Sequence, residues 1–307
     1  MNLHENFDFF GSRLDRYIGL KTEVKIPSKF TIISERAFWG KNIVSVVIPK
    51  SVRKIGKAAF AKCEQLTSVV LPEGIIIEEG AFVGCKSLKS LYLPKNAVIG
   101  MTAFGACENL CEIVFSEGIK SIGLGAFSRC SSLTAVNLPE SIENIEGCAF
   151  CECSNLTSIN IPQKITKITD SVFCDCEKLA SINIPKGVTI IEPRAFMGCE
   201  SLASIVLPQS LTTIQELAFA KCKSLTSIIL PESVKTVERF VFGECISLTS
   251  VTIPDNIVFS HPWVFVKCEK LKENWRSEGL CKHCGGKMKG LLIKHCVRCG
   301  KSNFSRE

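Results

Sequence analysis

The chain has 307 residues, of which 46% are hydrophobic and 22% charged, and this globular composition excludes a disordered chain as the default interpretation. No apolar run approaches the roughly 18 residues that a membrane-spanning helix requires, so no membrane span is expected. The first residues mix charged side chains with apolar ones, so no signal peptide is expected either. The net charge of +7 lies in residues 270–307, which hold ten Lys and Arg against three Glu, while the basic and acidic residues of the remainder cancel; this division indicates two domains.

A repeat accounts for most of the chain. Residues 1–23 precede it and are predicted to form an N-terminal cap. From there to residue 271 one pattern recurs every 22 or 23 residues, AFxxCxxLxxIxLPxxIxxI, and a period in this range is typical of solenoids. A phenylalanine marks the same place in each coil: Phe38, Phe60, Phe82, Phe104, Phe127, Phe150, Phe173, Phe196, Phe219, Phe242 and Phe265. We therefore predict a solenoid of about ten coils over residues 24–271.

The segment LxxIxLP alternates apolar and variable positions, which predicts a short strand whose Leu, Ile and Leu point inward. The proline that follows ends the strand. Because the unit recurs without drift, strands of successive coils can pair in parallel about 4.8 Å apart, with Phe on Phe and Leu on Leu inside. The predicted fold class is a repeat solenoid with a parallel β-sheet on one face and short strands or helical turns on the other.

These residues resemble the leucine-rich repeats of the BspA-like class, whose LxxIxIP and IxxIxxxAFxxC segments match residues 24–271. The resemblance implies a right-handed, curved solenoid and a family that serves mostly in binding and adhesion. We expect the chain to differ from the best-known members, because no secretion or wall-anchoring signal is evident in the sequence. We expect a cytoplasmic protein, and a surface location rests on the resemblance alone.

Ten of the eighteen cysteines occupy one repeat position, three residues after the Phe and three before the Leu. Cys is a small hydrophobe that suits a tight internal turn, so we predict a ladder of buried, reduced thiols, as in a reducing compartment. The alternative is a redox or metal-binding stack, which would require thiolates exposed to solvent. These ladder cysteines are Cys63, Cys85, Cys107, Cys130, Cys153, Cys176, Cys199, Cys222, Cys245 and Cys268. Packing at a repeat position also explains Cys111, Cys148, Cys151 and Cys174. The alternative for Cys151 and Cys174, which occupy equivalent places one coil apart, is a disulfide or a bound metal ion.

The outward positions of the predicted strands define a face on which a partner could bind. Most are small and uncharged, and Tyr92 and Glu112 are the least repetitive of them. These two residues are therefore candidates for a partner-binding patch. Asn137, Asn160 and Asn183 recur in successive coils, where they form either a stacked amide ladder or a ligand site.

Residues 272–307 contain two CxxCG motifs, Cys281 with Cys284 and Cys296 with Cys299, separated by eleven residues. Two thiolates three residues apart can bind one metal ion, and the glycine after each pair permits the positive φ that turns backbone amides towards sulfur. The paired motifs resemble a zinc ribbon. Because this basic segment has too few apolar residues to fold alone, we expect one structural zinc ion per chain, held by the four cysteines.

Two alternatives stay open for the C-terminal segment. His283 and His295 flank the motifs and could replace a cysteine as ligands. The basic residues either compensate the negative charge of a zinc ion bound by four thiolates or contact nucleic acid or an acidic protein.

The sequence contains no evident catalytic set. The four histidines lie outside the main body of repeats and form no nucleophile–base pair, and there is no phosphate-binding loop, no GxGxxG after a strand and no HExxH. We therefore expect a non-enzymatic interaction scaffold with a protein or peptide partner. The alternatives are a nucleic-acid-associated protein tethered by its basic zinc ribbon and a surface adhesin of the BspA-like type.

Overall fold

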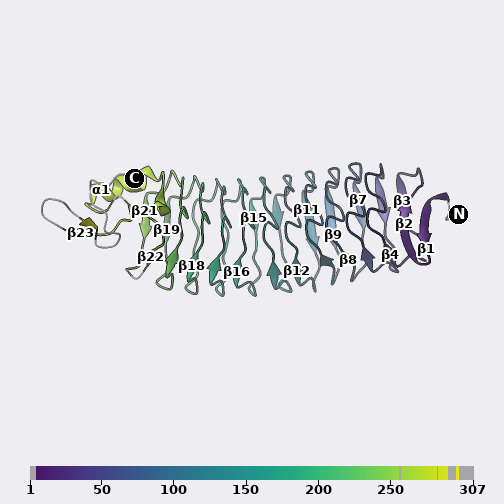
Figure 1. The fold of residues 1–307 in the computed structure, drawn as a ribbon, viewed down its shortest axis with the longest axis horizontal. Helices are drawn as coiled ribbons and strands as arrows, with labels where there is room; N and C mark the ends of the chain where they lie inside the picture. Colours follow the sequence, from purple (N-terminus) through teal and green to yellow (C-terminus); the bar gives the residue numbers. More distant parts are fainter. Residues whose placement is uncertain (1–4, 256, 282, 290–294, 297–307) are drawn as a thin grey trace. The chain divides into compact units, whose positions relative to one another are not determined.

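The computed structural model describes residues 5–255, 257–281, 283–289 and 295–296 of the chain. The repeats wind into a β-solenoid of about ten turns. They fall into two compact units, Met1–Ile165 with Asp175–Glu177 and Thr166–Cys174 with Lys178–Glu307, which are described separately. Within each unit, successive short strands lie side by side, and turns connect them into coils (Figure 1).

The first unit contains an eight-stranded sheet built mainly from the IxxI segments. Its strands β1 and β2 form an antiparallel hairpin in the predicted cap region, and β2 then pairs in parallel with β4. All later pairings in this sheet are parallel. In sheet order, its strands are β1 (Phe7–Phe10), β2 (Arg13–Tyr17), β4 (Ile32–Ile33), β6 (Lys54–Ile55), β8 (Ile76–Ile77), β10 (Val98–Ile99), β12 (Ser121–Ile122) and β14 (Asn144–Ile145).

The LxxIxLP segments of this unit also form parallel strands, as predicted. They make three smaller sheets: β3 (Glu23–Lys25), β5 (Ser45–Val47) and β7 (Ser68–Val70); β9 (Ser90–Leu93) and β11 (Glu112–Phe115); and β13 (Ala135–Val136) and β15 (Ser158–Ile159).

The sheet with the most strands is thus built from the IxxI segments, whereas the LxxIxLP segments form sheets of two or three strands. Proline after LxxIxL has no N–H to donate, so backbone pairing stops there. The IxxI strands are followed by residues that continue the pairing, since the amide of Glu78 donates to the carbonyl of Ile55 at 3.0 Å and that of Gly56 to Ile33 at 2.8 Å.

The second unit repeats this arrangement with a five-stranded and a two-stranded parallel sheet. The first contains β16 (Lys167–Ile168), β17 (Ile190–Ile191), β18 (Thr213–Ile214), β20 (Thr236–Val237) and β22 (Val258–Phe259), and the second β19 (Ser227–Ile229) and β21 (Ser250–Thr252). The repeats are followed by the 3₁₀ helix η2 (Pro262–Phe265), helix α1 (Glu269–Ser277) and the antiparallel strands β23 (Met288–Lys289) and β24 (His295–Cys296).

A stack of phenylalanine rings runs through the core of each unit, as predicted. In the first unit the rings of Phe60 and Phe82 are 5.0 Å apart and within 2° of parallel, and Tyr17 of the cap extends the stack to Phe38 at 5.0 Å. In the second unit the rings of Phe196 and Phe219 are 5.3 Å apart. These rings are fully buried, so the apolar face of each coil is covered by its neighbours.

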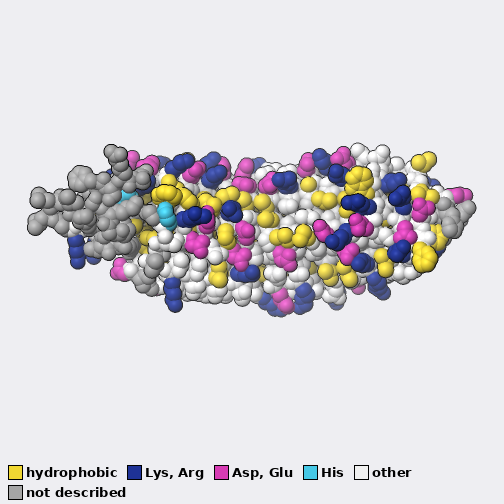
Figure 2. Space-filling model, in the orientation of Figure 1, with side chains coloured by type: hydrophobic (Ala, Val, Ile, Leu, Met, Phe, Trp, Pro, Cys, Tyr) yellow, Lys and Arg dark blue, Asp and Glu magenta, His cyan; other side chains and the backbone are white. Residues whose placement is uncertain are grey.

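Several charged side chains on the surface form ion pairs between neighbouring coils. Lys120 and Lys164 both contact Glu143, at 2.9 and 3.0 Å, and Arg129 contacts Glu152 at 3.0 Å. Basic and acidic side chains accordingly lie interspersed on the face in Figure 2. Exposed pairs of this kind contribute little to stability, because solvent screens the charges. No helix in the described part of the chain is long and apolar enough to cross a membrane.

Candidate functional site

The outward face of β5, β7, β9 and β11 carries a row of exposed apolar side chains, one on each strand, and β7 and β9 contact each other although they belong to different sheets. Cα pairing places Val47 beside Val70 and Tyr92 beside Val114. The same strand position is polar at both ends of the row, where Lys25 pairs with Val47 and Asn137 with Val114. We call Val47, Val70, Tyr92 and Val114 the apolar row.

Tyr92 is the most prominent member of the apolar row, with 58% of its surface exposed. The Ser116 hydroxyl donates a hydrogen bond to the Tyr92 hydroxyl at 3.0 Å, which fixes the direction of the ring. Ser116 stands where most coils have the proline that ends LxxIxLP, and this departure is the sequence signal for the contact. An oriented, exposed aromatic side chain is the residue type that most often dominates binding surfaces.

Glu112 lies on the same face as Tyr92. It is exposed and pairs with Ser90 on the neighbouring strand. The structure therefore brings the two least repetitive outward residues together on β9 and β11, and the carboxylate gives this otherwise apolar region one negative charge.

The three asparagines have different surroundings. Asn160 is engaged by the backbone of the preceding coil: its Oδ1 accepts from the Leu138 amide at 2.7 Å, and its Nδ2 donates to the Leu138 carbonyl at 2.8 Å. Asn137 is exposed beside Val114. Asn183 belongs to the second unit and pairs with Val206. The side chain of Asn160 thus has a structural role, while Asn137 presents an exposed amide next to the apolar row.

Two surface hollows were not anticipated from the sequence. One, in the first unit, has a volume of about 430 Å³ and is bordered by Glu108, Arg129 and Glu152. The other, of similar volume in the second unit, lies beside Asn183, Val206 and Lys186. The charged and polar residues that border the two hollows occupy variable repeat positions, which have no common pattern that would reveal a hollow.

The cysteine ladder is buried, as predicted, and each of its thiols donates to a backbone carbonyl. The Cys63 Sγ lies 3.0 Å from the carbonyl oxygen of Phe38 in the preceding coil, and the same bond recurs at 2.9–3.4 Å throughout the ladder. Burial raises the pKa of Cys63, Cys107 and Cys153 to about 12. Thiols in this state remain protonated near neutral pH and are poor nucleophiles and metal ligands, which favours the packing interpretation over a redox or metal-binding stack.

The two cysteines of the first CxxCG motif lie together. Cys281 and Cys284 are 1% and 3% exposed and form a cluster against which Phe259 and Met288 pack. Cys296 is on strand β24, where it pairs with Met288, and Cys299 lies outside the described residues. Among the described residues there is no group of three or more His, Cys, Asp or Glu side chains that could hold a metal ion.

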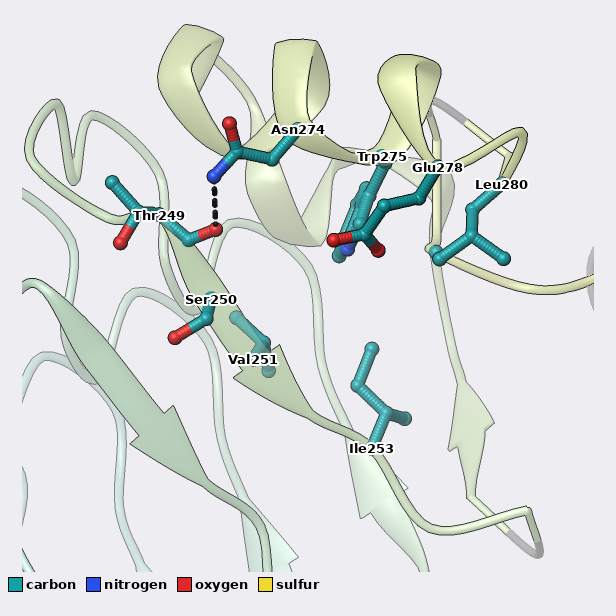
Figure 3. Close-up of a pocket in the computed structure, with 9 residues that line it drawn as sticks. Thr249, Ser250, Val251, Ile253, Asn274, Trp275, Glu278 and Leu280 are labelled. Atoms are coloured by element: carbon teal, nitrogen blue, oxygen red, sulfur yellow. Dashed lines mark hydrogen bonds between the residues drawn. The ribbon is translucent and has the colours of Figure 1, made fainter.

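A pocket of about 200 Å³ lies between β21, helix α1 and the segment that leads into the first CxxCG motif (Figure 3). Asn274 Nδ2 donates to the carbonyl of Thr249 across one side of it, at 3.0 Å. Val251, Trp275 and Glu278 are among the other residues that line it. The basic residues around this end are not all available to a partner, because Lys272 is buried and its Nζ lies 3.1 Å from Glu269.

The model of the family "BspA type leucine rich repeat region" matches residues 17–110, 75–203 and 189–285 of this chain. No curated protein matches the chain.

Several solved structures are similar to it in fold. A leucine-rich repeat protein from Bacteroides ovatus is 24% identical, with 87% of this chain and 91% of that chain covered and a TM-score of 0.50. A leucine-rich cell surface protein from Faecalibacterium prausnitzii is 23% identical, with 84% and 88% covered and a TM-score of 0.51. The pneumococcal vaccine antigen PcpA is 22% identical, with 83% and 78% covered and a TM-score of 0.58. The match to the family model agrees with the repeat pattern, the ring stack and the paired coils, and this chain belongs to the BspA-type leucine-rich repeat family.

Proposed function

We propose that this protein is a non-enzymatic interaction scaffold that binds a protein or peptide partner through the apolar row and its neighbours Glu112 and Asn137. The single observation that supports this most strongly is Tyr92, an exposed aromatic ring whose hydroxyl is held by Ser116 at 3.0 Å. A ring that is already oriented loses little conformational freedom on binding.

The surroundings of Tyr92 also fit this function. Four exposed apolar side chains in adjacent strands give a contiguous surface, and such surfaces in soluble proteins mark interaction sites. Lys25 and Asn137 at its ends, with Glu112 beside it, would supply the polar rim that surrounds the apolar centre of an interface.

The test compares Tyr92→Ala with Val98→Ala. Val98 is an exposed apolar residue of similar accessibility on the other sheet of the same unit, so it controls for a general loss of apolar surface. A partner captured by the wild-type chain is purified, and its dissociation constant is measured for all three proteins. We expect Tyr92→Ala to weaken binding at least about tenfold and Val98→Ala to leave it unchanged.

Equal binding by the wild type and Tyr92→Ala would contradict the proposal. Retention on RNA or DNA that is insensitive to Tyr92→Ala and lost on deleting residues 272–307 would replace it with the nucleic-acid alternative. The buried, ion-paired state of Lys272 does not favour that alternative.

We also propose a cytoplasmic location, on the basis of the hydrogen-bonded thiol ladder. Ten thiol donors are suited to a compartment that keeps cysteine reduced. Cell fractionation tests this, and recovery of the protein at the cell surface would support the adhesin alternative instead.

A further inference from the structure

Helix α1 stands beside β21, in the place of the strand that a further coil would add. Between coils of the second unit, the residue before each LxxIxLP strand accepts an amide from the next coil: the Thr226 carbonyl accepts from Thr249 at 2.9 Å. The Thr249 carbonyl instead accepts from Nδ2 of Asn274 at 3.0 Å. One side-chain amide of α1 thus replaces the next coil at the start of β21.

The same replacement is missing at Val251, the middle residue of β21. Thr252 faces the preceding strand β19, because its carbonyl accepts the Leu230 amide at 3.0 Å. Backbone groups alternate in direction along a strand, so the N–H and C=O of Val251 point away from β19, towards α1. Within the described part of the chain, no group forms a hydrogen bond with them. β21 therefore presents an unpaired donor and an unpaired acceptor to the space beneath α1.

This space is the pocket of about 200 Å³ in Figure 3. Its volume is below the roughly 300–1,000 Å³ of pockets for small molecules, so it has room for one side chain. Val251, Ile253 and Leu280 contribute apolar surface, and Trp275 forms a further wall. The pocket is thus open to a single inserted group with an apolar stem.

Glu278 gives the pocket its charge. It is the one charged residue among the described residues that line it, and Figure 3 shows its carboxylate turned inwards beneath α1, towards β21. Glu278 is exposed and forms no ion pair within the described ranges. Of the basic residues on α1, Lys272 is buried beside Glu269, and neither Lys270 nor Arg276 lines the pocket.

We infer that this pocket binds the side chain of a lysine or arginine from a peptide segment of a partner. The cation would lie between the Glu278 carboxylate and the Val251 carbonyl, both of which accept hydrogen bonds. Its aliphatic stem would pack against Leu280 and Trp275, since long basic side chains cover apolar surface in this way. An acidic side chain would be repelled by Glu278, and an apolar one would bury the Val251 carbonyl without a partner.

Peptide binding to the full chain tests the site. The probes are four pentapeptides of alanine, acetylated and amidated at their ends, with arginine, lysine, norleucine or glutamate in the middle. The signal is the NMR resonance of the Trp275 indole N–H, identified by its loss in Trp275→Phe. We expect a saturable shift of this resonance with the arginine and lysine peptides at millimolar concentrations and none with the other two.

Glu278→Gln should weaken binding of the arginine peptide at least about tenfold, because it removes the charge from a charge-assisted hydrogen bond. The matched control is Glu273→Gln, which removes an exposed carboxylate from the same helix outside the pocket and should leave the affinity unchanged. Tyr92→Ala should also leave it unchanged, since the site does not depend on the apolar row. The two binding surfaces can therefore fail separately.

The proposal is overturned if no peptide shifts the Trp275 resonance, or if the norleucine peptide shifts it as the arginine peptide does. Equal affinity of the wild type and Glu278→Gln would overturn it as well. The indole resonances of Trp39 and Trp263, which are exposed and do not line the pocket, report on the fold of each variant. Equal shifts of all the tryptophan resonances would indicate unspecific binding and would also contradict the site.

Discussion

The thiol of Cys107 donates to the carbonyl oxygen of Phe82, 3.4 Å away and one coil earlier in the chain. That carbonyl also accepts the amide of Cys85 at 3.2 Å. The ladder position thus selects a side chain that is small and apolar and also a donor, which explains why cysteine occupies it in coil after coil.

We expect Cys107→Ala to lower the free energy of unfolding by about 1–3 kcal/mol, because the substitution removes a buried hydrogen bond and leaves a small cavity. Cys111 is the matched control, since its thiol also donates to a carbonyl, that of Lys89 at 3.3 Å, but is exposed. Cys111→Ala should change the stability by less than about 0.5 kcal/mol. Denaturant unfolding measures both, and equal losses would show that burial at the ladder is not decisive.

The ladder also predicts a loss of stability in alkaline solution. The pKa of Cys107 is raised by burial to about 12, above the value of about 8.5 for an unfolded cysteine. The contribution of the protonated thiol is therefore fully present below about pH 8.5 and is lost as the pH rises towards 12. Above pH 8.5 each such thiol should lower the unfolding free energy by about 1.4 kcal/mol per pH unit.

Thermal or denaturant unfolding between pH 8 and 10 checks this slope in the wild type. Cys107→Ala should flatten it by the contribution of one thiol, whereas Cys111→Ala should leave it as it is. An unchanged slope in Cys107→Ala would mean that this thiol does not titrate on unfolding.

Several turns contain a non-glycine residue in the left-handed conformation, and Arg194 is a clear case with φ +55°. The β-carbon of an L-residue is strained there by roughly 1–2 kcal/mol, and Arg194 is exposed. We expect Arg194→Gly to raise the unfolding free energy by about 0.5–1 kcal/mol, after the larger entropy of unfolded glycine is offset. Arg194→Ala keeps the β-carbon and should give no gain; a gain of equal size would assign the effect to the arginine side chain.

Asn160 should be required for stability. Because its amide satisfies both the N–H and the C=O of Leu138, Asn160→Ala is expected to lower the unfolding free energy by about 1–2 kcal/mol. Asn160→Asp should also destabilise, since a carboxylate can accept from the N–H but repels the carbonyl. Asn137→Ala, on the preceding coil, should stay within about 0.5 kcal/mol, and partner binding by this variant reports on the surface role of Asn137.

The repeat made much of the fold predictable. The spacing of Phe60 and Phe82 anticipates their stacking, and the position of Cys107 between apolar residues anticipates its burial, since both follow from aligning identical coils. The hydrogen bond of Cys107 to Phe82 could not be predicted, because it depends on the turn geometry between two coils.

The candidate site was only partly predictable for a similar reason. Tyr92 and Glu112 are visible as breaks in a pattern, and the structure places them on adjacent strands. The hydrogen bond between Tyr92 and Ser116 and the two hydrogen bonds between the Asn160 side chain and the Leu138 backbone connect different repeat positions in neighbouring coils. Alternation along one strand contains no information about such diagonal contacts.

The residue-to-residue register between coils makes the length of the protein adjustable in whole steps. Ser121 pairs with Asn144 and Ile122 with Ile145, so deleting residues 122–144 would join Ser121 to Ile145, and Ile145 would take the place of Ile122 beside Ile99. Each insertion or deletion of this size shifts the downstream coils by one strand spacing, about 4.8 Å. Unequal recombination between near-identical coils can therefore lengthen or shorten a binding surface without redesigning its core.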